Sequence, residues 1–124
     1  MILDTNALSA FADGDPKIEP HVRVAHVAIP VVVLGEYRYG IAHSTRRSRY
    51  EAWLESFLPA TRVLEISQET TLWYAQVRSE LRRQGTPIPA NDIWIAALSR
   101  QHDQSVLSKD LHFDAVKGLR RVGW

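Results

Sequence analysis

Four carboxylates, widely separated along the chain, stand where an α/β fold can bring side chains together. They are Asp4, Glu36, Asp92 and Asp110. Carboxylates gathered in one cleft repel one another and lose hydration, so a fold retains such a group most readily when it binds a hard divalent cation. A metal ion and a water molecule in an acidic cleft are the usual means of hydrolysing a phosphodiester. These four side chains are therefore candidates for metal-dependent hydrolysis.

The sequence around each carboxylate predicts its place in the fold. Asp4 and Asp110 each follow a short apolar run that is typical of a buried strand, and Asp92 stands near the start of a predicted helix. Glu36 lies inside a helix that Pro30 can open, because the first helical position needs no amide donor. In parallel sheets the carboxyl ends of the strands face the ligand crevice. We therefore expect all four carboxylates to reach the same end of one sheet.

Apolar runs and breakers along the chain alternate between strand and helix patterns. The predicted strands are residues 1–3, 26–29, 62–66 and 105–107, with a fifth at an edge over 119–122. The first predicted helix is capped by Thr5 or Asn6 and runs to about residue 12. The others are 30–41, 44–58, 68–84 after a Ser67 cap, and 90–102, whereas 17–26 is not assigned. This order predicts βαβ units, and hence an α/β fold of three layers, α/β/α, with a mostly parallel sheet of four or five strands.

Composition sets bounds on the class of protein. A chain of 124 residues with 45% hydrophobic residues suits one domain, over 1–124, with a real core. Lys and Arg total 15 against 14 Asp and Glu, and this balance of +1 neither requires nor excludes nucleic acid. Cysteine is absent, which excludes disulfides and thiol chemistry and fits a reducing cytoplasm. No apolar run approaches the ~20 residues of a membrane span, and we expect no signal peptide before the first strand.

At the level of motifs, the chain resembles the PIN-domain family, and within it the VapC-type ribonuclease toxins. The resemblance runs from end to end and is carried by four segments in order: Ile2-Leu3-Asp4-Thr5-Asn6, Glu36-Tyr37-Arg38-Tyr39-Gly40, Asn91-Asp92-Ile93-Trp94-Ile95-Ala96-Ala97 and Leu107-Ser108-Lys109-Asp110-Leu111-His112-Phe113. Two residues depart from the family's pattern. Ser108 stands where Thr is more frequent, which keeps the hydroxyl, and Pro30 stands where a small polar residue is usual.

This resemblance implies an endoribonuclease that depends on Mg²⁺ or Mn²⁺, with the four carboxylates as its acidic site. It implies Thr5 or Asn6, together with Ser108, as supporting groups. It further implies a cognate VapB-type antitoxin that blocks the site, and a homodimer as the usual assembly. Because Mg²⁺ needs only one or two direct carboxylates, we expect Asp4 and Asp92 to be the direct ligands. Asp110 and Glu36 would bind the metal through water, form a second metal site, or orient the attacking water.

An RNA substrate must also be attracted to this acidic pocket. Three groups of basic side chains could bind phosphates beside the cut: Arg46, Arg47 and Arg49, then Arg78, Arg82 and Arg83, and finally Lys109, Arg120 and Arg121. Arginines on helices are more often solvated than bound to RNA, so these contacts rest on the proposed substrate. His112 is expected to be a surface or packing residue.

Three other functions compete with a ribonuclease toxin. A phosphatase of the haloacid-dehalogenase type needs a second aspartate two positions after the first, and Asn6 occupies that place. A non-catalytic module could use the acidic pocket only to bind basic segments of a partner. Such a protein would tolerate the loss of one metal-binding carboxylate, and because all four are present, catalysis is favoured. A PIN-domain nuclease of RNA processing would carry the same four carboxylates, so the residues alone separate it poorly from a toxin.

Overall fold

A five-stranded parallel sheet forms the centre of the molecule in the computed structural model, which describes residues 1–124. Its strands are β1 (Ile2–Leu3), β2 (Ala28–Pro30), β3 (Arg62–Leu64), β4 (Val106–Leu107) and β5 (Arg121–Val122). They lie in the order β3-β2-β1-β4-β5, and every neighbouring pair is parallel. Strand β1 therefore lies at the middle of the sheet, between β2, which follows it in the sequence, and β4, which comes much later.

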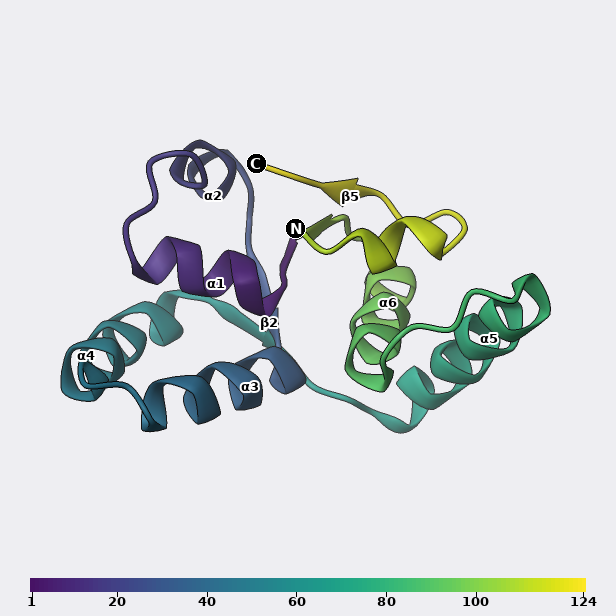
Figure 1. Cartoon of the computed structure of the whole chain (residues 1–124), viewed down its shortest axis with the longest axis horizontal. Helices are drawn as coiled ribbons and strands as arrows, with labels where there is room; N and C mark the ends of the chain where they lie inside the picture. Colours follow the sequence, from purple (N-terminus) through teal and green to yellow (C-terminus); the bar gives the residue numbers. More distant parts are fainter.

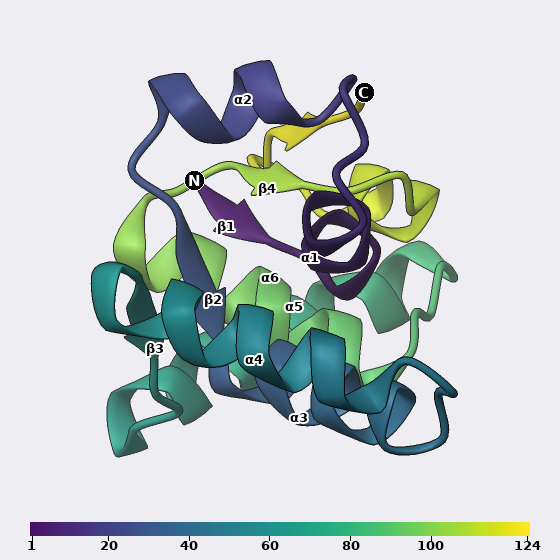
Figure 2. The ribbon, with the colours of Figure 1, turned by 90° about the vertical axis from the view of Figure 1, so that its left-hand side faces the viewer.

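Helices cover both faces of this sheet, which gives the expected three layers (Figure 1). The helices are α1 (Thr5–Ala12), α2 (Glu19–Val24), α3 (Val31–Ala42), α4 (Arg47–Phe57), α5 (Gln68–Gln84) and α6 (Ala90–His102). Two short 3-10 turns, η1 (Leu58–Ala60) and η2 (Leu111–Ala115), complete the chain. Helices α1, α3 and α4 pack together on one face, whereas α5 and α6 pack together on the other, behind the sheet in the view of Figure 2.

The core consists of two clusters of buried residues. The larger one has 17 buried residues, among them Ile2, Leu3 and Leu107 of the central strands, and it extends to Phe113. The smaller one has five buried residues and joins α5 to α6 through Val77 and Leu81. The short inner strands β1, β2 and β4 are stable because both of their faces are buried, as is typical of parallel sheets.

Most element boundaries confirm the sequence analysis. The α6 range matches the expected helix, Ser67 caps α5 with a capping box, and β5 is an edge strand. Gly85 ends α5 in the left-handed conformation, at φ 70°, where a residue with a Cβ is strained. None of the helices has both the length and the apolar composition that a membrane crossing requires.

Four local expectations were wrong. The N-cap of α1 is Asp4 rather than Thr5 or Asn6, because the Asp4 carboxylate accepts the Thr5 amide. Pro30 ends β2 and precedes α3 instead of lying inside it, and β2 itself begins at Ala28. The helix expected from residue 44 begins only at Arg47, since Ser44 and its neighbours form a turn closed by the Ser44 hydroxyl.

Candidate active site

The two central strands, β1 and β4, bring Asp4 and Asp110 to the same edge of the sheet. Leu3 pairs with Leu107 in register, so the two strands end side by side. Asp4 follows β1 directly, and its amide donates to the Leu107 carbonyl at 3.2 Å. Asp110 stands three residues past β4, at the N-cap of η2. The carboxyl ends of neighbouring parallel strands thus place two acidic residues together, as the sequence analysis expected.

Asp4 is the most deeply placed of the four carboxylates, with 5% of its surface exposed. One oxygen, Oδ1, accepts the Thr5 amide at 2.7 Å. The other, Oδ2, accepts from Asn6 Nδ2 at 2.8 Å and from Ser108 Oγ at 2.6 Å. These donors hold the carboxylate in one orientation and favour its charged form, because hydrogen bonds to an ionised acceptor are stronger than those to a neutral one.

The Ser108 hydroxyl connects Asp4 to Asp110. It donates to Asp4 and accepts the amide of Asp110 at 2.9 Å, and the residue is fully buried. Asn6 supports the same segment, since its Oδ1 accepts the Lys109 amide at 3.1 Å. The three residues expected to support the site, Thr5, Asn6 and Ser108, therefore all contact its carboxylates or their backbone.

Glu36 reaches this edge from the second turn of α3. Its Oε2 accepts the Thr5 hydroxyl at 2.8 Å, and its Oε1 accepts the side-chain amide of Asn91. Thr5 belongs to α1, and Asn91 to the first turn of α6. The Glu36 carboxylate is thus fixed by donors from helices on both faces of the sheet.

Asp92 and Asp110 meet at His112. The imidazole Nδ1 lies 2.9 Å from Asp92 Oδ2 and 3.0 Å from Asp110 Oδ1. The His112 amide also donates to Asp110 Oδ1, at 2.9 Å, which fixes the turn that carries both residues. With these contacts, hydrogen bonds and neighbouring residues join all four carboxylates into one cluster.

Burial and mutual repulsion both perturb this cluster. Burial raises the pKa of Asp4, and the nearby Asp110 and Glu36 carboxylates raise it further, against the hydrogen bonds from Ser108 and Thr5. Burial likewise raises the pKa of Asp92, which also feels Asp110 and Asp4. The hydrogen bond that the imidazole of His112 donates to Asp92 raises the pKa of His112. The site therefore favours a positive charge, whether a proton or a cation, among its carboxylates.

The donor set fits a hard divalent cation. Asp92, Asp110 and His112 each offer one ligand atom, and these atoms all lie within 4.8 Å of one another. Carboxylate oxygens are the ligands that Mg²⁺ and Mn²⁺ prefer, whereas an imidazole nitrogen suits Mn²⁺ and later transition metals better than Mg²⁺. Asp4 lies beside this group through Ser108 and could supply a further oxygen.

Two residues of the cluster were missed by the sequence analysis. His112 is half exposed, as a surface residue would be, but it also bridges two carboxylates. Asn91 was noted only as the neighbour of Asp92, yet it binds Glu36. No local pattern predicts either contact, because the partners are 20 residues apart for His112 and Asp92 and 55 residues apart for Asn91 and Glu36.

The expected RNA contacts lie outside this network. Arg46 precedes α4, Arg47 pairs with Glu51 at 2.8 Å, and Arg49 is exposed. Lys109 is the nearest to the carboxylates in the chain, and its Nζ lies 4.8 Å from the centre of the Trp124 ring. Whether these four residues touch RNA stays a prediction.

Comparison with known proteins agrees with this geometry. The family model of the PIN domain matches residues 1–119. A tRNA(fMet)-specific endonuclease VapC of Shigella flexneri is 31% identical over 79% of this chain and 75% of its own length, and its namesake from Salmonella typhimurium is 28% identical over 99% and 96%. In the crystal structure of DNA-bound VapBC from Salmonella typhimurium, one chain superposes with a TM-score of 0.87 at 27% identity, over 99% of this chain and 96% of that one. The fold, the motifs and these likenesses together show that the chain belongs to the PIN-domain family, among its VapC ribonucleases.

Proposed function

We propose that this protein is a metal-dependent endoribonuclease toxin that hydrolyses RNA phosphodiester bonds in the cytoplasm and is inhibited by a cognate antitoxin. The observation that carries the proposal is the hydrogen-bonded cluster of Asp4, Glu36, Asp92 and Asp110 in a member of the VapC ribonucleases. A cluster with raised carboxylate pKa values is costly to maintain without a cation. Mg²⁺ or Mn²⁺ is the proposed cofactor.

Asp4 and Asp92 are the proposed direct ligands of the metal ion. Asp110 and His112 lie close enough to Asp92 to bind the same metal ion, directly or through water. When bound, the metal ion lowers the pKa of a coordinated water and offsets the negative charge that develops at the phosphorus.

Glu36 is the proposed group that orients the attacking water. Its two oxygens already accept from Thr5 and Asn91, so the carboxylate cannot rotate freely and keeps a lone pair aimed at a fixed place. A carboxylate held in this way can accept a hydrogen from the water as it approaches the phosphate. Thr5 and Asn91 act as positioning residues, since they touch Glu36 and not the substrate.

The relatives support the proposed partners. Structures of VapBC from Salmonella typhimurium and of VapBC2 from Rickettsia felis are of toxin–antitoxin complexes bound to DNA. We propose that a VapB-type antitoxin binds this chain and covers its acidic site, and that the chain forms a homodimer. A gene for a small DNA-binding protein beside this one would support a toxin over a nuclease of RNA processing.

The decisive experiment compares RNA ends after incubation with wild type, Asp92→Asn and Asp103→Asn. Asp103 ends the same helix in the left-handed conformation, which Asn tolerates well, so its variant is a matched control. With Mg²⁺ or Mn²⁺, wild type and Asp103→Asn should produce the same specific new ends, and Asp92→Asn should produce none. Equal cutting by all three proteins, or cutting that persists in EDTA, would instead favour a non-catalytic acidic-pocket module contaminated by another nuclease.

A further inference from the structure

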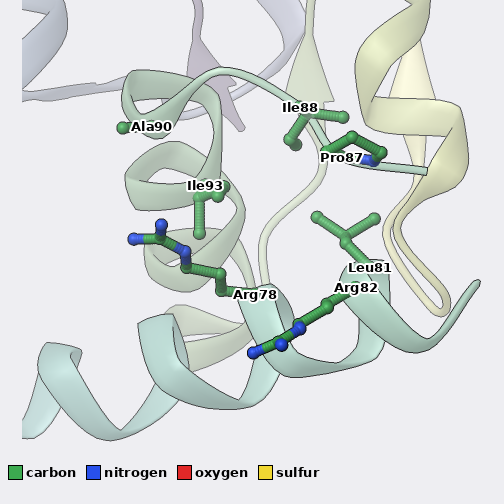
Figure 3. A pocket seen from close by; sticks show the side chains of 7 residues that line it. All are labelled: Arg78, Leu81, Arg82, Pro87, Ile88, Ala90 and Ile93. Carbon is green, nitrogen blue, oxygen red and sulfur yellow. The ribbon is translucent and has the colours of Figure 1, made fainter. Parts of the chain in front are cut away.

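A second concave feature lies on the α5 and α6 side of the sheet, between α5 and the start of α6 (Figure 3). Its volume is about 470 Å³, within the range of pockets that hold small molecules or single nucleotides. We call it the arginine-rimmed pocket, and its lining residues are Arg78, Leu81, Arg82, Pro87, Ile88, Ala90 and Ile93. Arg78 and Arg82 are exposed, whereas Leu81 and Ile93 are buried.

The arginine-rimmed pocket shares a helical turn with the candidate active site. Ala90 and Ile93 line the pocket, and Asn91 and Asp92, which stand between them, contact Glu36 and His112. Four successive helical residues span only about 4.5 Å along the axis. Because each helical residue is turned about 100° from the one before, Ala90 and Ile93 face away from Asn91 and Asp92. A polymer that passes around this first turn of α6, which is about 10–12 Å across, would meet both the pocket and the carboxylates.

The charge at the pocket's rim is not neutralised by the protein. Arg82 has no side-chain hydrogen bond or ion pair, and Arg78 donates only to the Tyr74 hydroxyl, at 3.0 Å. In contrast, Arg100 on the neighbouring helix pairs with Glu80 at 2.7 Å. No acidic residue lines the pocket. The contact with Tyr74 orients one guanidinium group without cancelling its charge.

We infer that the arginine-rimmed pocket is a subsite for one nucleotide of single-stranded RNA beside the cleavage site. Arg78 and Arg82 bind the flanking phosphates, since a guanidinium group matches phosphate in geometry and charge. The apolar floor of Leu81, Ile88 and Ile93 receives an unstacked base. This inference rests on the proposed function, because it assumes that RNA reaches the carboxylates.

A second copy of this chain fits the pocket less well than RNA. A twofold contact places the same patch of both copies face to face. Such a contact would bring the unpaired Arg78 and Arg82 of one copy towards those of the other, and the pocket offers no carboxylate to separate them. A polyanion such as RNA is instead attracted by the guanidinium charges of both Arg78 and Arg82.

The test measures RNA binding without cleavage. Fluorescence anisotropy of a labelled single-stranded RNA in EDTA compares wild type, Arg78→Gln/Arg82→Gln, and the control Lys17→Gln/Arg62→Gln. Lys17 and Arg62 are exposed and lie outside both the pocket and the acidic cluster, so the control removes the same charge elsewhere. We expect the pocket variant to raise Kd at least ten-fold, and the slope of log K against log salt to fall by about 1.4 for two phosphates on a single strand. The control should change both by much less.

An apolar variant, Ile88→Ser, examines the base subsite separately. It should weaken binding while leaving the salt slope as in wild type, because it removes no charge. Circular dichroism should show that each variant is folded, and light scattering should show an unchanged oligomeric state.

Three results would overturn the inference. They are an unchanged Kd and slope in the arginine variant, an equal loss in the control, or a loss of binding that coincides with dissociation of a dimer, which would make the pocket an interface between copies. The proposed function fails by a different result: wild type that binds RNA but leaves it intact with Mg²⁺ and Mn²⁺. The two failures are therefore distinguishable.

Discussion

Removing the Ser108 hydroxyl should loosen the candidate active site more than any other single-atom change in its supporting residues. The hydroxyl is fully buried, donates to Asp4 Oδ2 at 2.6 Å and accepts the Asp110 amide at 2.9 Å. A hydrogen bond to a charged group contributes about 1.5–3 kcal/mol, and one between neutral groups about 0.5–1.5 kcal/mol. Because both partners lose a bond in Ser108→Ala, we expect a loss of about 2–4 kcal/mol of unfolding free energy.

Urea denaturation in EDTA measures this loss without a contribution from metal binding. For a chain of this size, 1 kcal/mol corresponds to about 4 °C in Tm, so thermal melting should fall by about 8–16 °C. Ser108→Thr keeps the hydroxyl and adds one methyl group to a buried position, which should cost about 1 kcal/mol, at the low end for an added buried methylene. Ser56→Ala is the matched control, since the exposed Ser56 hydroxyl bonds only to the Trp53 carbonyl, and it should stay within about 0.5 kcal/mol of wild type.

A double-mutant cycle tests whether the effect runs through Asp4. In the Asp4→Asn background, Ser108→Ala should cost about 1.5 kcal/mol less than it does alone, because the charged acceptor is already gone. If Ser108→Ala melts with wild type, or if its cost is the same in both backgrounds, the hydroxyl does not hold the carboxylate and the account of the cluster is wrong.

Four further predictions concern the cation, the proton and the backbone. Mn²⁺ at about 100 times its Kd should stabilise wild type by about 2.7 kcal/mol in differential scanning fluorimetry, and Asp92→Asn should lose this shift; a shift that survives the substitution would place the ion elsewhere. His112→Ala should weaken Mn²⁺ binding more than Mg²⁺ binding in calorimetry, because Mg²⁺ prefers oxygen ligands; equal losses would exclude a nitrogen ligand. The pKa values of Asp4, Asp92 and His112 are raised in the fold. These groups therefore stabilise the metal-free protein below their unfolded pKa values, and that stabilisation is lost as pH rises through their folded pKa values. Tm in EDTA should increase as pH falls from about 8 to about 5, and a Tm that falls over this range would contradict the raised pKa values. Gly85→Ala should cost about 1 kcal/mol because φ is +70° there, whereas Gly40→Ala, inside α3 with no atom near its added Cβ, should be neutral or stabilising by a similar amount; similar melting of the two variants would be inconsistent with that difference.

The layout of the fold was predictable because local patterns and topology agree. Apolar runs followed by acidic residues indicated the central strands. In a parallel sheet all strands end at the same edge, so the residues that follow these strands lie at that edge. The same patterns predict that Asp4 and Asp110 lie at one edge of the sheet, as the register of β1 and β4 confirms. The α6 helix was located equally well, since Pro89 directly precedes it.

The finer structure of the site could not be predicted in the same way. His112 was assigned to the surface because a lone histidine beside Phe113 has no metal-ligand spacing, and its role depends on a turn, η2, that no propensity indicates. The cap of α1 was placed on Thr5 or Asn6, but the Thr5 hydroxyl is already committed to Glu36, 31 positions away. Hydrogen bonds between distant segments determine both the contacts of His112 and the cap of α1, and no local sequence pattern predicts such bonds.

The position of β1 at the middle of the sheet has a consequence for synthesis. Its neighbour β4 brings Ser108, which leaves the ribosome 104 residues after Asp4. Until then Asp4 has neither its buried hydroxyl partner nor the Asp110 carboxylate beside it. A nascent chain should therefore be unable to assemble the acidic cluster until this segment has emerged.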